Sequence, residues 1–248
     1  MRHTLLTLCF RHRSSLLLLL AAPIVQACVR GGRLDPSAGA VGLLLVVAGV
    51  SLRLHASRQI GRGARVHRAH ASAGLVCSGP YTWTRNPLYL AASLMVGGFA
   101  ALAGAPALAL SAATIAVYLP VILHEEEKLS ELLGPPYQRY KLRVPRLLGR
   151  FYPMAEASDG PRVPWRNVFR IEKALVPGSL AAAAAIPLMR MGILPLALPI
   201  QALARSLGVG TDAVVAAGFL LAALGNSWKI ERNQRRRHGA PARQTAPA

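Results

Sequence analysis

Two groups of polar residues flank the longest uncharged stretch of the sequence. Arg85 and Asn86 precede this stretch and a run of three glutamates begins at Glu125, whereas residues 88–123 contain no charged side chain. An arginine can bind an anion such as a carboxylate, and a glutamate can bind a cation or accept a proton. The two groups could therefore form one charged site if the fold brings them together.

The length of the uncharged stretch indicates how they could meet. Crossing a bilayer takes about 20 apolar residues, so residues 88–123 are too many for one span and about right for two short ones. Gly104-Ala105-Pro106 is a turn signal near the middle. Two spans of similar length joined by a tight turn emerge on the same membrane face. We therefore expect both polar groups at one mouth of a helical hairpin, where ionisable residues often mark functional sites.

Each group also has a simpler explanation. Asn86 followed by Pro87 is a good start for any helix, because Asn caps helices well and proline fits the first helical position. Arg85 could extend along the membrane interface. The glutamates could form a solvated helix face, with Lys128 as a local ion-pair partner of Glu125. These alternatives stay open at the level of sequence.

The composition identifies the broad class of protein. Hydrophobic residues make up 53% of the 248 residues and charged residues only 16%, with a mean hydropathy of +0.36. A water-soluble domain usually carries about a quarter charged residues, and a disordered chain is far less apolar. We predict an all-α, polytopic transmembrane protein. Its expected spans, about six, are residues 14–29, 36–52, two within 88–123, 174–189 and 212–228, with residues 193–204 re-entrant or interfacial.

The basic residues predict the topology. Lys and Arg number 29 against 10 Asp and Glu, and 25 of the 29 lie in residues 1–13, 53–85, 128–173 and 229–243. The other four, in the alternate segments, are Arg30, Arg33, Arg190 and Arg205. By the positive-inside rule both termini are cytoplasmic, and the protein is expected in the bacterial inner membrane. Anionic phospholipid headgroups are the expected partners of these basic segments, and specific nucleic-acid binding is not expected.

The pattern divides the chain into four predicted parts. They are a transmembrane hairpin (1–52), a core with a cytoplasmic loop and the central hairpin (53–150), a transmembrane extension (151–228) and a basic cytoplasmic tail (229–248). Residues 1–24 could instead be a signal peptide, and Cys28 a lipoprotein cysteine, although a retained first span fits better. Cys9, Cys28 and Cys77 are isolated, so neither a disulfide framework nor a metal site is predicted.

Both flanks of the hairpin carry motifs of a known family. Residues 79–89 read GPYTWTRNPLY and resemble the segment G-x-Y-x-x-x-R-H-P-x-Y of the isoprenylcysteine carboxyl methyltransferases. Residues 125–146 resemble that family's segment EExxLxxxFGxxYxxYxxxVPR. The phospholipid methyltransferases are built on a related plan. The resemblance covers residues 73–150, with two motifs in the right order around the hairpin.

The resemblance implies an integral membrane methyltransferase that uses S-adenosylmethionine. The N-terminus of the first hairpin helix, at residues 86–88, together with Arg85, would bind the carboxylate of this cofactor. Glu125 and Glu126 would take its ammonium group and balance its sulfonium, with Glu126 as the base if the acceptor is an ammonium group. The implied catalytic residues are Arg85 and Glu126. The implied cofactor-binding residues are Leu75, Val76, Tyr81, Asn86, Pro87, Leu88, Tyr89, Glu125, Tyr137 and Tyr140.

The methyl acceptor stays open, because the chain departs from the family pattern. Asn86 replaces the motif histidine, Leu133 replaces a phenylalanine, and residues 118–123 lack the arginine that the family often places before its paired glutamates. A membrane-dissolved or interfacial acceptor is expected: an isoprenylcysteine-type carboxylate, a phospholipid amine, or a small thiol or other lipid. The alternatives are a non-catalytic membrane protein that retains the hairpin and, on account of Arg190, a transporter.

Overall fold

The computed structural model describes residues 2–60, 75–148, 162–194 and 197–238, and in these residues it is helical without strands. This confirms the predicted all-α class. Parts of the predicted basic segments 53–85 and 128–173, and most of the predicted tail 229–248, lie outside these residues or have undescribed side chains. The helices are α1 (Arg2–Arg30), α2 (Pro36–Ile60), α3 (Pro87–Ala103), α4 (Ala107–Leu133), α5 (Pro135–Arg143), α6 (Trp165–Ile171), α7 (Leu175–Arg190), α8 (Ala197–Leu207) and α9 (Thr211–His238), with a 3-10 turn, η3, at Gly79–Thr82.

Four helices of the described chain, α1, α2, α4 and α9, are long and apolar enough to cross a membrane. A fifth candidate is α6 with α7, which are bent by 61° at their junction. The count is therefore four to five rather than about six. The difference arises at α3, whose 17 residues reach roughly 25 Å, less than the hydrocarbon thickness of about 30 Å. The structure is that of a polytopic helical membrane protein.

Several helices continue beyond the ends predicted for them. Helix α4 reaches Leu133 instead of residue 123, α2 reaches Ile60 instead of residue 52, and α9 reaches His238 instead of residue 228. The prediction ended each span near the first charged residue. Glu, Lys and Arg are good helix formers, so a helix can continue past the membrane edge. The extension of α4 matters most, because it places the glutamates on the same helix as the second span of the hairpin.

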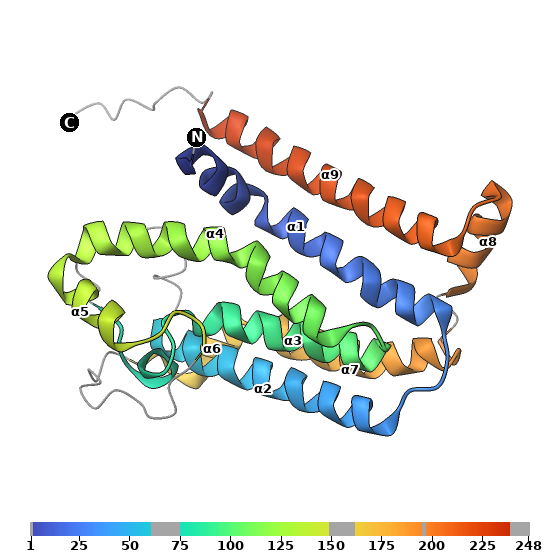
Figure 1. The fold of residues 1–248 in the computed structure, drawn as a ribbon, viewed down its shortest axis with the longest axis horizontal. Helices are drawn as coiled ribbons and strands as arrows, with labels where there is room; N and C mark the ends of the chain where they lie inside the picture. Colours follow the sequence, from blue (N-terminus) through green and yellow to red (C-terminus); the bar gives the residue numbers. More distant parts are fainter. Residues whose placement is uncertain (1, 61–74, 149–161, 195–196, 239–248) are drawn as a thin grey trace, which may run out of the picture.

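Helices α2 and α3 lie side by side and antiparallel (Figure 1). Glycines allow their backbones to come close: a Cβ atom on Gly98 would lie 2.6 Å from the Gly42 carbonyl oxygen, and one on Gly49 would lie 2.8 Å from the Ala91 carbonyl oxygen. Small residues at a helix interface permit such close packing inside a membrane. This contact fixes the position of α3, whose first turn carries the candidate site.

The predicted hairpin is present as α3 and α4. Helix α3 ends at Gly104, which has a φ of +71° and so adopts the left-handed conformation that favours glycine. The two helices are joined again farther from the turn, where the Ser93 and Ser111 hydroxyls each donate to the other residue's carbonyl oxygen at 2.9 and 3.1 Å. The first residues of α3 and the last turns of α4 therefore lie at the same end of the bundle.

Helices α1 and α9 form a second antiparallel pair (Figure 1). The Asn226 amide donates to the Ser15 hydroxyl at 2.9 Å near one end, and Arg30 pairs with Asp212 at 2.6 Å near the other. The beginning of α1 and the end of α9 lie at the end of the bundle that also holds α5 and α6 (Figure 1). The beginning of α1 and the end of α9 thus lie on the side of the candidate site, and the cytoplasmic assignment of that side remains a prediction.

Arg190 lies at the opposite end of the bundle, in the last turn of α7. Its guanidinium donates to the carbonyl oxygens of Ala103 and of Arg33, the latter at 3.1 Å. It thereby ties the end of α3 to the α1–α2 connection. These contacts give Arg190 a structural role at a helix end, which weakens the reason for considering a transporter.

Candidate active site

The second motif folds back onto the first. Helix α4 ends at Gly134, which has a φ of +59°, and α5 begins at Pro135 in a new direction. Tyr137 and Tyr140 of α5 are buried and pack with Cys77 of the segment before η3. The Tyr140 hydroxyl donates to the Tyr81 carbonyl oxygen at 2.7 Å. The two motifs therefore share one packed core beside the hairpin mouth.

Backbone contacts bring the end of the second motif next to the start of α3. The Arg85 N–H donates to the Pro145 carbonyl oxygen at 2.9 Å. The Thr84 hydroxyl and the Asn86 side-chain amide both donate to the Arg146 carbonyl oxygen, at 3.2 and 3.1 Å. Hydrogen bonds to backbone carbonyl oxygens thus hold residues 84–86 against residues 145–146, independently of the ion pairs.

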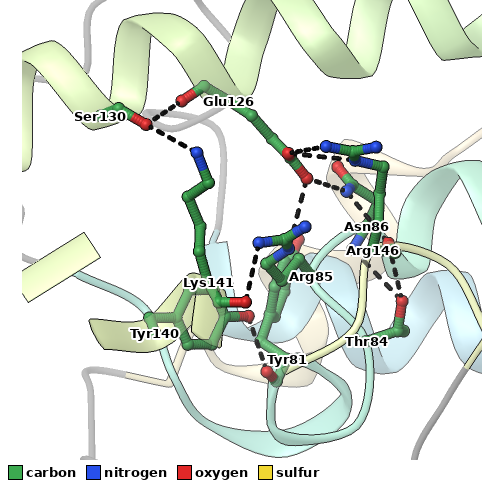
Figure 2. Close-up of polar contacts among 9 residues, drawn as sticks. All are labelled: Tyr81, Thr84, Arg85, Asn86, Glu126, Ser130, Tyr140, Lys141 and Arg146. Carbon is green, nitrogen blue, oxygen red and sulfur yellow. Dashed lines mark hydrogen bonds and ion pairs between the residues drawn. The ribbon is translucent and has the colours of Figure 1, made fainter. Parts of the chain in front are cut away.

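Glu126 lies at the centre of the polar contacts in Figure 2, with only 4% of its surface exposed. Arg146 donates to carboxylate oxygen Oε2 from Nε at 3.1 Å and from Nη2 at 3.0 Å. Asn86 Nδ2 donates to Oε1 at 3.0 Å, and Arg85 Nε lies 3.3 Å from the same oxygen. We call these four residues the Glu126 cluster. The predicted meeting of the two flanks, 40 residues apart, is confirmed.

The Glu126 cluster has an excess of positive charge, because two guanidinium groups face one carboxylate. The Arg85 side chain is 8% exposed, and its Nη1 also donates to the Lys141 carbonyl oxygen at 3.2 Å. The Arg146 side chain is 40% exposed. An anion approaching from the side of Arg146 would balance the cluster.

Asn86 does not act as a side-chain cap for α3. It occupies the N-cap position but makes no capping hydrogen bond, and its amide is directed to Glu126 and to the Arg146 carbonyl oxygen instead. The simple N-cap explanation therefore does not account for this side chain. A histidine N–H could donate to the same carboxylate, so asparagine preserves the donor that the family motif supplies. The first turn of α3 is left without a side-chain cap, which favours anion binding there.

The neighbouring glutamate has a different environment. Glu125 Oε2 accepts a hydrogen bond from the Tyr89 hydroxyl at 2.8 Å. The Tyr89 ring contacts the Tyr118 ring, with centroids 4.6 Å apart. Consecutive helical residues point in different directions, so Glu126 contacts two arginines, while Glu125 accepts a hydrogen bond from a phenol and is acted on by the charges of Arg13 and Lys128.

The remaining predicted site residues lie around these two groups. Leu75 packs against the Tyr137–Tyr140 core, and Val76 is half-buried beside it in the chain. Pro87 is buried and Leu88 half-buried at the start of α3. Burial raises the pKa of both the Tyr137 and the Tyr140 hydroxyl, so these groups stay protonated at neutral pH. They can donate hydrogen bonds but cannot serve as a base.

Sequence reasoning missed three residues that complete this arrangement. Arg146 stood in the quoted motif without an assigned role, although it makes the two shortest contacts from an arginine to Glu126. Thr84 bridges to the second motif. Lys141 Nζ lies 3.4 Å from the Ser130 hydroxyl, which donates to the Glu126 carbonyl oxygen at 2.6 Å. The arginine that ends the second motif was the signal that could have identified Arg146.

In the part of the chain that the structure describes, no group of three metal-ligating side chains is gathered. Cys28 and Cys77 are both buried free thiols. Burial raises the pKa of the Cys77 thiol, which keeps it protonated at neutral pH. The chemistry of the site therefore has to be argued from its charged and hydrogen-bonding side chains.

The fold and the paired motifs together define a helical membrane protein with a polar site at the mouth of a hairpin. Residues 38–135 match the family model described as phospholipid methyltransferase. This match confirms the family resemblance that the two motifs indicated, and it supports a membrane methyltransferase. The match begins in α2 and ends at the start of α5, so Arg146 lies beyond it. No curated protein and no solved structure matches the chain.

Proposed function

We propose that this protein transfers a methyl group from S-adenosylmethionine to an acceptor dissolved in the membrane or lying at its surface. The observation that carries the proposal is the Glu126 cluster, in which Arg85 and Asn86 of one motif meet Glu126 and Arg146 of the other. The cofactor combines a carboxylate, an ammonium, a sulfonium and an adenine. The site offers groups suited to each of the charged parts.

The carboxylate of the cofactor fits the positive side of the site. Arg146 is partly exposed and belongs to a cluster with surplus positive charge. The first turn of α3, which has no side-chain cap, adds the Leu88 N–H and the positive end of a helix dipole, whereas Pro87 has no N–H and the Tyr89 N–H donates to the Asn86 carbonyl oxygen. In this proposal Glu126 holds Arg85 and Arg146 in place as a positioning residue, and the arginines bind the ligand.

The positive parts of the cofactor fit Glu125 and its tyrosine partners. The hydrogen-bond donor to Glu125 is uncharged, so an ammonium or sulfonium can approach this carboxylate in competition with Arg13 and Lys128, whose charges also act on it. The Tyr89 and Tyr118 rings can face a cation as well. In this proposal Glu125 alone takes the cation-binding role that was predicted for Glu125 and Glu126 together.

The bound cofactor would supply an activated methyl group, whose transfer needs mainly alignment with the acceptor and exclusion of water. A carboxylate or thiolate acceptor arrives ready to react. An ammonium acceptor must first lose a proton, and Glu125 is the better base because Glu126 is already engaged by two arginines.

Two acceptor classes deserve separate assays. The family match and the absence of an arginine in residues 118–123 favour a phospholipid amine. The motifs quoted from the sequence favour an isoprenylcysteine-type carboxylate. Purified protein in vesicles, supplied with radiolabelled S-adenosylmethionine, should label phosphatidylethanolamine or a farnesylcysteine substrate, and the labelled product distinguishes the two.

The cofactor itself is tested first with detergent-solubilised protein and S-adenosylhomocysteine, the demethylated product. Ligand at 100 times its dissociation constant should stabilise the protein by about 2.7 kcal/mol, which is a clear thermal shift. If millimolar ligand gives no heat of binding and no thermal shift, the non-catalytic alternative becomes the better explanation.

A further inference from the structure

A second buried glutamate lies where the C-terminal extension meets the methyltransferase core. Glu172, 6% exposed, stands at the break between α6 and α7. The hydroxyl of Ser57, a fully buried residue of α2, donates to Glu172 Oε1 at 2.8 Å. Arg53 of the same helix donates from Nε to Oε2 at 3.3 Å. We call Arg53, Ser57 and Glu172 the Glu172 clasp.

The segment around α6 makes further contacts with the last turns of α2. The Val163 N–H donates to the Arg58 carbonyl oxygen at 2.8 Å. The Arg58 guanidinium lies over the Trp165 ring at 4.8 Å from its centroid, and the His55 ring meets Trp165 edge to face at 5.3 Å. Helix α6 is therefore docked on the end of α2 by ionic, backbone and aromatic contacts.

The same end of α2 contacts the segment that leads into the Glu126 cluster. The Ser78 hydroxyl donates to Gln59 Oε1 at 2.8 Å. Gly79 has a φ of +57°, and a Cβ atom there would lie 2.6 Å from Gln59 Nε2. The η3 turn starts at Gly79 and is followed within a few residues by Arg85. The C-terminal extension and the segment that begins the first motif thus both contact the last turns of α2.

We propose that the C-terminal extension positions the candidate cofactor site, with Glu172 as the positioning residue. The Glu172 clasp fixes the end of α2, and Gln59 on that end fixes the turn at Ser78 and Gly79. This turn sets where residues 84–86 reach Glu126 and Arg146. The statement about the cofactor rests on the proposed function, whereas the coupling between Glu172 and the turn at Ser78 does not.

Cys77 offers a readout that needs no ligand. It is buried beside Ser78, while Cys28 is buried in a separate core formed with Val46 and Leu102. Maleimide labelling of Cys77 and Cys28 in the detergent-solubilised full chain can be followed by peptide mass spectrometry, which separates both from Cys9. Cys77 then reports local loosening of the first motif, and Cys28 reports general loosening of the bundle.

The variants are Glu172→Ala and Ser57→Ala, with Glu172→Gln as the conservative change and Asp212→Ala as the matched control. Asp212 forms an ion pair with Arg30 at the opposite end of the bundle. We expect the first two variants to label Cys77 roughly fivefold to tenfold faster, as for one lost hydrogen bond, with Cys28 unchanged. Glu172→Gln should recover most of the protection, and Asp212→Ala should resemble the wild type.

The same variants are titrated with S-adenosylhomocysteine. Glu172→Ala and Ser57→Ala should raise its Kd roughly fivefold or more, whereas Asp212→Ala should not. Equal labelling of Cys77 in all variants, or a parallel rise at Cys28, would overturn the inference. So would unchanged affinity in a variant whose Cys77 is exposed. If the wild type does not bind the ligand, the proposed function fails and the labelling alone decides the coupling.

Discussion

Glu126 and Glu172 are both buried in the described part of the chain, but they differ in the charged groups around them. Glu126 is 4% exposed and faces two arginines and an asparagine amide. Glu172 is 6% exposed, and its contacts with described residues include Arg53 and the Ser57 hydroxyl. The Glu172 clasp is therefore balanced in charge, whereas the Glu126 cluster carries one excess positive charge and a partly exposed arginine.

This difference separates a structural contact from a candidate binding site. A balanced ion pair with its hydrogen bonds satisfied has little to gain from a ligand, and its role is to hold elements together. A cluster with excess charge and an accessible cation gains when an anion arrives. We therefore expect changes in the Glu172 clasp to act through positioning, and changes in the Glu126 cluster to act on ligand binding directly.

The largest expected effect comes from removing the charge of Glu126. Glu126→Gln leaves the buried Arg85 and the partly exposed Arg146 without the carboxylate they share, which should lower the free energy of unfolding by about 3 kcal/mol. Glu172→Gln leaves one arginine that is partly exposed, so its cost should be smaller, about 1 kcal/mol. Denaturant unfolding in detergent measures both. Equal losses would contradict the distinction between the two clusters.

The next effect separates ligand binding from stability. Arg146→Met removes a charge-assisted contact and should weaken S-adenosylhomocysteine binding by about 1.5 to 3 kcal/mol. Arg53→Met in the Glu172 clasp should weaken binding less than Arg146→Met does, and lower stability more. Calorimetric titration and unfolding of both variants test this, and the opposite ranking would show that Arg146 is structural.

The smallest effect concerns Asn86. Asn86→Ala removes the hydrogen bonds to Glu126 and to the Arg146 carbonyl oxygen and should cost about 1 kcal/mol of binding. Asn86→His restores a donor and the family motif, so it should preserve or improve cofactor affinity. Affinity is measured for both variants with the wild type as reference. If histidine is no better than alanine, donation to Glu126 is not what this position provides.

The hairpin and its charged mouth were predictable because they follow from local features. An uncharged run with a turn signal and polar residues at both ends requires no knowledge of distant contacts. Burial of Glu172 was not predictable, because its segment reads as a basic loop and its partners lie on α2, 115 residues earlier. The same holds for Arg146, whose partner Glu126 is reached only after α5 folds back at Gly134.

Helix ends were predicted less well than helix positions. The charged residues after residue 123 end the apolar pattern without ending α4, since glutamate and lysine stabilise helices. The simpler alternative for Asn86, a side-chain N-cap, is wrong for a related reason. Its sequence context suits an N-cap, and only the position of Glu126 on the extended α4 draws the side chain away from the helix start.

The central claim is that the two motifs form one site for one ligand, and a double-mutant cycle tests it most directly. Arg85 comes from the first motif and Arg146 from the second, and both face Glu126. The affinity for S-adenosylhomocysteine is measured by calorimetry for the wild type, Arg85→Met, Arg146→Met and the double variant. We predict that each single change weakens binding and that the double change departs from the sum by clearly more than about 0.5 kcal/mol, as for residues that share a ligand. Effects that add within that margin, or singles that leave the affinity unchanged, would contradict a shared site.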